Sequence, residues 1–249
     1  MSMGRRKRML VLCPFPFGVQ AGQRLKFEQY YDDWRAHGWD IRIAPFMDLG
    51  LWRILYERGH LPAKVFGTIR GYLRRVPDFL RIGTYDLVYC HMHVTPLGTS
   101  APERLVRARA KRLVFDVEDN VLVGQPIEKK DHQNWLARIL RRKSKARFLI
   151  RTADHVVTSS PSLNQQCLQI NEKRACTYIS SSVDADRFHP ANRFSNDGRL
   201  TIGWTGTFSS RPYLDQLGPV FQRLASQRQF TLRVIGKTLA ASKPAPRRP

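Results

Sequence analysis

Two histidines follow an apolar run in the first half of the sequence. His91 and His93 come directly after Asp86–Cys90, and two residues apart on an extended chain they point to the same side. Together they could ligate a metal ion, but no third ligand at a matching spacing accompanies them, so we expect no metal. The alternative is that one histidine ends the strand or contacts a polar substrate.

Three acids cluster where the next apolar run ends. Asp116, Glu118 and Asp119 close the run that begins at Leu113, and their carboxylates can act as a general base or hold substrate hydroxyl groups. The same residue types also cap helices or pair with nearby arginines. The sequence leaves both readings open.

A third candidate lies near the end of the chain, in Leu200–Gln216 (LTIGWTGTFSSRPYLDQ). A short apolar strand leads into a turn of small residues and then a helix with Pro212 in its first turn. Backbone N–H groups at such a helix start favour an anion, and Arg211 could add a positive charge. Many strand-to-helix turns carry glycine and serine for geometry alone, which is the competing interpretation.

The elements that must position these residues alternate between strand and helix. We predict strands at Met9–Cys13, Trp39–Ala44, Asp86–Cys90, Leu113–Asp116, His155–Thr158 and Thr177–Ile179. Helices are predicted at Gln23–His37, Pro102–Ala110, Asp131–Thr152 and Pro161–Ile170, with Met47–Ile82 mostly helical. This alternation predicts a doubly wound α/β sheet, whose ligands bind beyond the carboxyl ends of the strands.

The polar stretch Asn192–Arg199 divides the chain. We expect a first domain over 1–190, a linker at 191–199 and a second, incomplete domain over 200–237. The second domain has a predicted helix at Tyr213–Arg228 and a second strand at Phe230–Ile235. Two strands and one helix bury little of a sheet, and residues 238–249 form a basic, proline-rich tail that we expect to be disordered.

The composition is strongly basic. The 249 residues carry a formal net charge of +22, which favours polyanionic partners such as anionic lipid, phosphorylated small molecules or nucleic acid. No recognisable nucleic-acid-binding motif accompanies the charge, so no specific nucleic acid is expected. The four cysteines lack zinc or redox spacing and are expected to be reduced, with Cys13 and Cys90 buried in strands. No run is long enough to span a membrane, and Pro14 and Pro16 argue against a signal peptide.

The helix predicted at Asp131–Thr152 has basic and apolar residues interleaved at helical spacing, without an acid after Asp131. Such a helix suits the surface of an anionic membrane, and a solvated face is the simpler alternative. The residues expected to face the membrane are Arg138, Arg141, Arg142 and Lys145.

Two segments resemble retaining glycosyltransferases of the large group 1 (family 4) type. Ser180–Pro190 (SSSVDADRFHP) resembles the joint between their two domains, and Ile202–Leu214 (IGWTGTFSSRPYL) resembles the first glycine loop of their donor-binding domain. Tyr85–Gly98, Leu113–Val121 and Ala153–Leu163 are similar to the acceptor domain of one branch. The resemblance covers Met9 to about Lys237.

The resemblance implies a GT-B fold, with two Rossmann-like domains facing one active site. It implies transfer of a sugar from a nucleotide-diphosphate donor, with retention and without a metal or other cofactor, to an envelope lipid or polysaccharide. The expected location is the cytoplasm, peripherally on the inner face of the cell membrane. The alternative is a basic protein that binds nucleic acid or a membrane surface without catalysis.

The resemblance also implies roles for individual residues. The expected catalytic residues are His91, Asp116 and Asp119. The expected donor-binding residues are Gly18, Gln23, Arg24, Gly203, Thr205, Gly206, Thr207, Ser209, Ser210 and Arg211. The expected acceptor-binding residues are His93, Glu118, Ser160, Ser181 and Asp184.

The sequence departs from the family pattern at three points. Thr207 stands where many members have a basic residue, and Ser181–Ser182 replace the usual Asn-Gly of the joint. The later acidic motif, which holds the donor sugar and ribose in the family, is not in this chain. We therefore expect impaired turnover from the chain as given.

Overall fold

The computed structural model describes residues 5–57, 59–118, 142–186, 200–206 and 210–236. The chain divides into two compact units, unit 1 over Met1–Phe188 and unit 2 over His189–Pro249. The linker predicted at 191–199 and the tail predicted at 238–249 lie outside the described residues.

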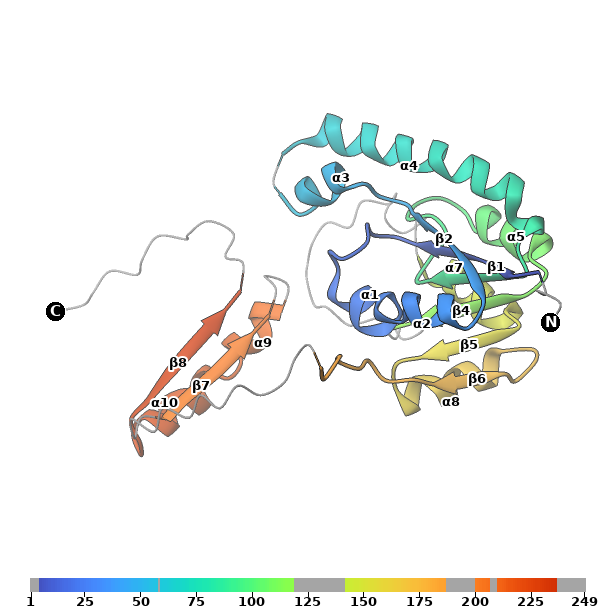
Figure 1. Ribbon diagram of the computed structural model, residues 1–249. Coiled ribbons are helices and arrows are strands. Elements are labelled where there is room, and N and C mark those ends of the chain that lie inside the picture. Colours follow the sequence, from blue (N-terminus) through green and yellow to red (C-terminus); the bar gives the residue numbers. More distant parts are fainter. Residues whose placement is uncertain (1–4, 58, 119–141, 187–199, 207–209, 237–249) are drawn as a thin grey trace. The chain divides into compact units, whose positions relative to one another are not determined.

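Unit 1 is built on a six-stranded parallel sheet (Figure 1). Its strands are β1 (Lys7–Cys13), β2 (Trp39–Pro45), β3 (Leu87–His91), β4 (Leu113–Val117), β5 (His155–Thr158) and β6 (Cys176–Tyr178). They lie in the order β2-β1-β3-β4-β5-β6, so the direction of winding reverses between β1 and β3. The doubly wound sheet predicted from the sequence is confirmed.

Alternating residues of β1 explain why helices cover both faces of this sheet. Leu10 and Leu12 belong to a core shared with the helices after β3, β4 and β5. Met9, Val11 and Cys13 pack on the opposite face with the aromatic residues that follow β1. A strand that is apolar on both faces requires cover on both, as in other parallel sheets.

The segment after β1 is helical but interrupted. It forms α1 (Ala21–Lys26), a 3-10 turn at Glu28–Tyr30 and α2 (Tyr31–Ala36), where the sequence predicted a single helix over Gln23–His37. Phe27 leaves the helical region with φ of −143°, and its ring is buried in the second core. Burial of the aromatic side chain accompanies the break, so the apolar periodicity alone did not reveal it.

The remaining helices of unit 1 follow the predicted alternation. They are α3 (Leu49–Ile54), α4 (Leu61–Arg81) with a 3-10 turn at Ile82–Thr84, α5 (Ala101–Arg109), α7 (Arg142–Thr152) and α8 (Pro161–Ile170). Arg75 anchors α4 to the sheet because its buried guanidinium donates to the carbonyls of Ala44 at 2.5 Å, Cys13 at 2.9 Å and Val94 at 3.1 Å. Asp78 balances its charge at 3.4 Å.

Lys145 corrects the membrane prediction made for α7. Only 1% of its side chain is exposed, and its ammonium donates to the carbonyls of Thr95 at 3.0 Å and Leu97 at 2.8 Å. Glu103 of α5 supplies the opposite charge at 3.6 Å. The expectation that Lys145 faces a membrane was therefore wrong, because a paired lysine here joins α7 to α5 inside the fold. Arg138 and Arg141 lie outside the described residues, as does the side chain of Arg142.

Unit 2 contains a two-stranded parallel sheet, β7 (Leu200–Thr205) and β8 (Phe230–Ile235), in the part of the chain that the structure describes. Between them lie α9 (Arg211–Asp215) and α10 (Gly218–Ala225), where the sequence predicted one helix over Tyr213–Arg228. Gln216 and Leu217 separate the two helices. Pro219 lies in the first turn of the second helix, a position that proline tolerates.

Candidate active site

The site lies at the carboxyl edge of unit 1, where the winding of the sheet reverses. The loop after β1 and the end of β3 meet there, and His91 of β3 is in register with Asp116 of β4. Open α/β sheets bind their ligands at this kind of switch point because the chain leaves β1 and β3 in opposite directions.

Asp116 is the centre of a buried polar cluster. Its carboxylate is fully buried and accepts hydrogen bonds from the Tyr89 hydroxyl at 2.7 Å and from His91 Nδ1 at 3.2 Å. Lys26 of α1 forms an ion pair with its other oxygen. Burial alone would raise the pKa of Asp116, but the hydrogen bond and charge of His91, together with Lys26, outweigh it and lower this pKa. Asp116 is therefore held as a carboxylate.

His91 connects this buried charge to a second, accessible carboxylate. Its ring is fully buried, and Nε2 lies 4.0 Å from the Glu118 carboxylate, which is 28% exposed. With Asp116 at Nδ1, the imidazole is oriented so that Nε2, which is itself buried, faces Glu118. The line Asp116–His91–Glu118 is an arrangement that can hold a proton at Nε2 or accept hydrogen bonds from substrate hydroxyls at Glu118.

Gly22 makes room for the Glu118 side chain beside α1. A β-carbon added at Gly22 would collide with the Glu118 carboxylate, so the absence of a side chain there lets the helix and the acid approach. On the other side, the Ser159 hydroxyl donates to the Glu118 carbonyl. The group that lies closest to Gly22 is thus the Glu118 side chain.

Gln23 and Glu28 hold the loop that follows β1. Gln23 is fully buried, and its amide bonds the backbone of Phe15 on both sides, at 3.0 Å and 3.1 Å. Glu28 accepts from Gln23 and from the backbone N–H of Gly18, each at 2.9 Å. Gly18 itself is exposed with φ of +79°, a conformation that favours glycine. The hydrogen-bonding groups of Gln23 are thus occupied within the protein, while Arg24 is exposed.

The other residues predicted for the site in unit 1 differ in their burial. His93 is buried, after a left-handed turn at Met92 with φ of 60°. Ser160 caps α8 by accepting from the N–H of Leu163 at 3.2 Å. Ser181 and Asp184 are exposed. Asp119 lies outside the described residues.

In unit 2, the predicted donor residues surround the end of β7. Gly206 donates its N–H to the Ile235 carbonyl at 3.1 Å, and a β-carbon there would collide with the Trp204 ring. Arg211 is exposed and begins α9, directly after Ser210. Gly203 and Thr205 are exposed on β7, and Thr207 and Ser209 lie outside the described residues.

Lys26 and Tyr89 are site residues that sequence reasoning missed. Lys26 lies four residues after Gly22, so both are on the inward side of α1. A lysine on the buried side of a helix is a signal for a buried acid partner, because an unpaired charge there is costly. Tyr89 lies two residues before His91 and so shares its face of β3. The spacing of two residues between Tyr89 and His91 was visible in the sequence.

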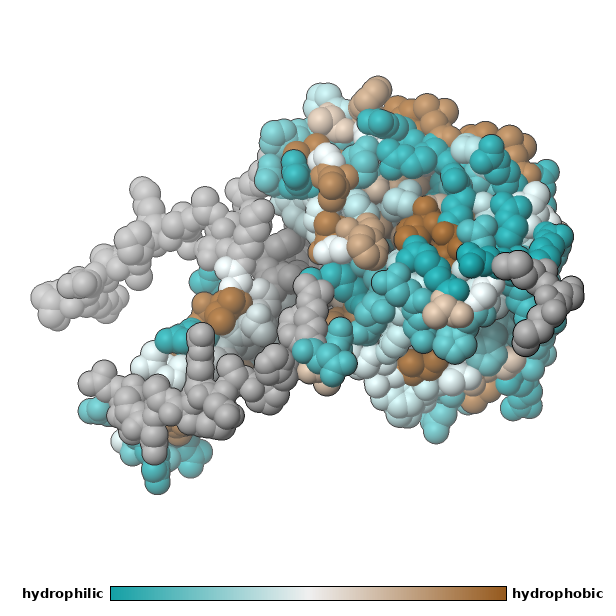
Figure 2. Space-filling model, viewed as in Figure 1, coloured by the Kyte–Doolittle hydropathy of each residue, from teal (hydrophilic) through white to brown (hydrophobic). Residues whose placement is uncertain are grey.

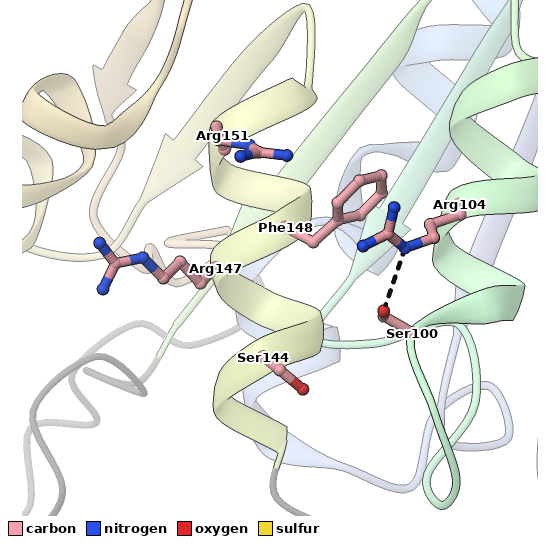
Figure 3. Close-up of a pocket in the computed structure, with 6 residues that line it drawn as sticks. All are labelled: Ser100, Arg104, Ser144, Arg147, Phe148 and Arg151. Atoms are coloured by element: carbon pink, nitrogen blue, oxygen red, sulfur yellow. Dashed lines mark hydrogen bonds between the residues drawn. The ribbon is translucent and has the colours of Figure 1, made fainter.

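A basic hollow of about 250 Å³ lies between α5 and α7, and none of the predicted site residues lines it. Figure 3 shows Arg104 of α5 and Phe148 of α7 facing each other across it, with the guanidinium carbon 5.0 Å from the ring centre. Arg147 extends from another side of α7 (Figure 3). Its remaining lining residues are Ser100, Ser144 and Arg151.

Within the described residues, no group of three or more histidine, cysteine or acidic side chains could hold a metal ion. No described helix is both long and apolar enough to cross a membrane.

The fold is an α/β fold of the GT-B-like class, and the fold class predicted from the sequence is confirmed. One of the solved structures similar to this chain is HepE from Anabaena. Its crystal structure in complex with UDP-glucose matches with a TM-score of 0.50 and 13% identity over 92% of this chain and 68% of HepE. A second HepE structure, with UDP and glucose, aligns with a TM-score of 0.44 and 11% identity over 93% and 69% of the two chains. No protein-family model matches the sequence, and no curated protein matches it.

Proposed function

We propose that this chain is a glycosyltransferase that binds a nucleotide-diphosphate sugar. The observation that carries the proposal is the Asp116–His91–Glu118 line at the switch point of a fold shared with HepE, which was crystallised with UDP-glucose. The partly exposed Glu118 carboxylate beside a buried histidine suits the hydroxyl groups of a sugar, because these groups can donate hydrogen bonds to it.

Each unit supplies a different part of the chemistry. In unit 1, Glu118 binds hydroxyl groups, and His91, oriented by Asp116, presents Nε2 as the polar atom next to them. In unit 2, the Arg211 guanidinium at the start of α9 binds the diphosphate of the donor. This stabilises the negative charge of the leaving group without a metal ion.

The finer assignment rests on the sequence resemblance. It supports transfer with retention of configuration, to an envelope lipid or polysaccharide, by an enzyme on the cytoplasmic side of the membrane. The anomeric configuration of the transferred sugar, measured by proton NMR on the product, tests retention directly.

Binding of the donor is tested by isothermal titration of the full chain with UDP, GDP and ADP. We expect one of these to bind, and Arg211→Gln to weaken it by about tenfold or more, since a hydrogen bond to a charged group contributes about 1.5–3 kcal/mol. The matched control is Arg223→Gln, an exposed arginine on α10. No binding by any nucleotide, or equal losses in both variants, would refute the proposal.

Catalysis is tested separately with Glu118→Gln. We expect it to keep nucleotide affinity and to lose at least about tenfold in turnover, because an amide neither carries the charge nor accepts as strongly as a carboxylate. Glu172→Gln, an exposed acid beside Arg151, is the control. Unchanged turnover in Glu118→Gln would remove Glu118 from the site.

A further inference from the structure

The long helix α4 has small and charged residues on its inner side and most of its apolar residues on its outer side. Its inward side carries Gly67, Gly71, Arg75 and Asp78, the last three of them buried. Most of its large apolar side chains are exposed instead, while Tyr72 and Phe79 pack against the cores of unit 1. A core-facing helix normally buries its apolar stripe, so this outward stripe has another purpose than packing unit 1.

Seven side chains form this outward stripe, which we call the apolar ridge. Each is between 48% and 72% exposed, and most recur three or four residues apart along one side of the helix. Figure 1 shows α4 as the outermost element along one side of unit 1, and Figure 2 shows the hydrophobic surface along that edge. The ridge consists of Leu61, Val65, Phe66, Ile69, Leu73, Val76 and Leu80.

The ridge has basic neighbours and no exposed acid on its own helix. Arg70 is 64% exposed in its side chain, and Arg81 is exposed near the other end of α4. Asp78 is the single acidic residue of α4, and only 3% of its side chain is exposed because it faces Arg75 and Arg42. Asp48, at the end of α3, pairs with Arg70 and Arg74. The outward face of α4 therefore joins apolar and positively charged groups.

We propose that the apolar ridge of α4 is the surface by which this protein binds an anionic lipid membrane. A 21-residue helix is about 30 Å long, and apolar side chains with arginines at their margin match acyl chains below negatively charged headgroups. The arginines exclude a spanning role, so the helix lies along the surface.

A second copy of this chain is the competing occupant, and the charge argues against it. Two ridges packed together would bring the exposed Arg70 and Arg81 of both copies to one interface, in molecules that each carry a net charge of +22. Like charges at an interface weaken association. The negative charges of an anionic membrane would instead attract these arginines.

The experiment is co-sedimentation of the full chain with vesicles of phosphatidylcholine, with and without phosphatidylglycerol, at low salt. We expect binding to the anionic vesicles only. Phe66→Gln/Leu73→Gln, which changes two exposed ridge residues, should weaken it by about tenfold or more. Arg70→Gln and Arg81→Gln should each weaken it by roughly fivefold. The matched control, Val220→Gln/Val234→Gln, replaces two exposed apolar residues of unit 2.

Three results would overturn the inference. These are equal sedimentation of wild type and Phe66→Gln/Leu73→Gln, equal binding to neutral and anionic vesicles, and a dimer seen by light scattering that only the ridge variant dissociates. Nucleotide titration of Phe66→Gln/Leu73→Gln keeps the two proposals apart, since we expect its nucleotide affinity to match wild type. Loss of vesicle binding with intact nucleotide binding therefore concerns the ridge alone.

Discussion

Asp116 holds its charge in the interior because three side chains from two other elements converge on it. Lys26 comes from α1, Tyr89 and His91 from β3, and Asp116 itself from β4. A buried ion pair adds little net stability relative to apolar residues, but removing one partner leaves the other charge uncompensated. The cluster is therefore sensitive to single changes in a way that an exposed pair is not.

Asp116→Asn is expected to lower the free energy of unfolding by about 3–5 kcal/mol, because it leaves the Lys26 ammonium buried without its counter-charge. Urea denaturation followed by circular dichroism measures the loss. Glu118→Gln serves as the comparison and should cost less than about 1 kcal/mol, since Glu118 is partly exposed. Equal losses in the two variants would show that the charge of Asp116 is not what the cluster depends on.

Asp154 gives the protein an acid-sensitive contact. It accepts from the N–H of Leu113 at 2.7 Å and pairs with Arg107 at 3.0 Å and with Lys173. Burial opposes ionisation, but these partners outweigh it and lower the pKa of Asp154 in the folded state. A lowered pKa stabilises the fold fully above the unfolded value of about 3.9, and this contribution is lost as the pH falls through the folded value.

We therefore expect Asp154→Asn to reduce the difference in stability between pH 6 and pH 3, as measured by urea titrations at each pH. Asp184→Asn, which changes an exposed acid, should leave that difference as in wild type. A pH dependence that does not change in Asp154→Asn would mean that other carboxylates dominate acid unfolding.

At the scale of elements, α4 approaches the sheet through glycine. A β-carbon at Gly71 would lie 2.6 Å from the Phe46 ring and 2.9 Å from the Phe46 carbonyl, closer than packed atoms tolerate. Arg75, one turn further on, can reach the carbonyls at the ends of β1 and β2 only from a helix this close. The small residue and the buried arginine are therefore parts of one contact.

Gly71→Ala should lower the free energy of unfolding by about 1–3 kcal/mol, because overpacking shifts α4 away from Phe46. Thermal or urea unfolding measures the effect. Gly83→Ala is the control, since a β-carbon there meets no atom closer than the Arg109 carbonyl at 3.8 Å. If both variants unfold like wild type, α4 has room to move at this contact.

Strand positions were predictable from sequence, whereas helix boundaries and helix orientation were less so. Apolar runs such as Leu10–Cys13 identify buried parallel strands because both of their faces are covered. Met47–Ile82 was predicted to be mostly helical, but the side of α4 that faces the core was not predicted, since it depends on what Arg75 and Asp78 bind. The break at Phe27 depends on an aromatic pocket formed by distant residues.

Part of the candidate site was also predictable from the positions of the strands. His91 and Asp116 follow from the rule that ligands bind beyond strand ends, and β3 and β4 are neighbours. Lys26 lies 90 residues from Asp116 in the sequence. Its place on the buried side of α1 indicates an acidic partner, but no local pattern tells which acid it is. The same limit applies to Lys145, whose partners in the fold are Thr95, Leu97 and Glu103.

At the scale of the molecule, the four cysteines report on unit 1, which contains all of them. They are free thiols, as predicted, and Cys13, Cys90 and Cys167 are buried. Burial, only partly offset by Arg75, raises the pKa of Cys13 to about 12. Because the thiolate is the reactive form, a buried thiol of high pKa reacts slowly.

Iodoacetamide labelling of the native protein, followed by peptide mass spectrometry, should modify Cys176 first, because it is the partly exposed cysteine. Cys13 and Cys90 should become labelled only in urea, together, as unit 1 unfolds. Early labelling of Cys13 in native buffer would show that the sheet opens at the end of β1 without global unfolding.

The contact between Gly22 and the Glu118 carboxylate has a consequence for inheritance. A methyl group added at residue 22 would displace the Glu118 carboxylate from its present place, because the two would occupy the same space. The Glu118 side chain is partly exposed and can turn away from α1, so such a change would first alter the distance between Glu118 and His91. Among descendants of a common ancestor, a larger residue 22 should therefore accompany a changed residue 118 wherever that distance matters for the activity.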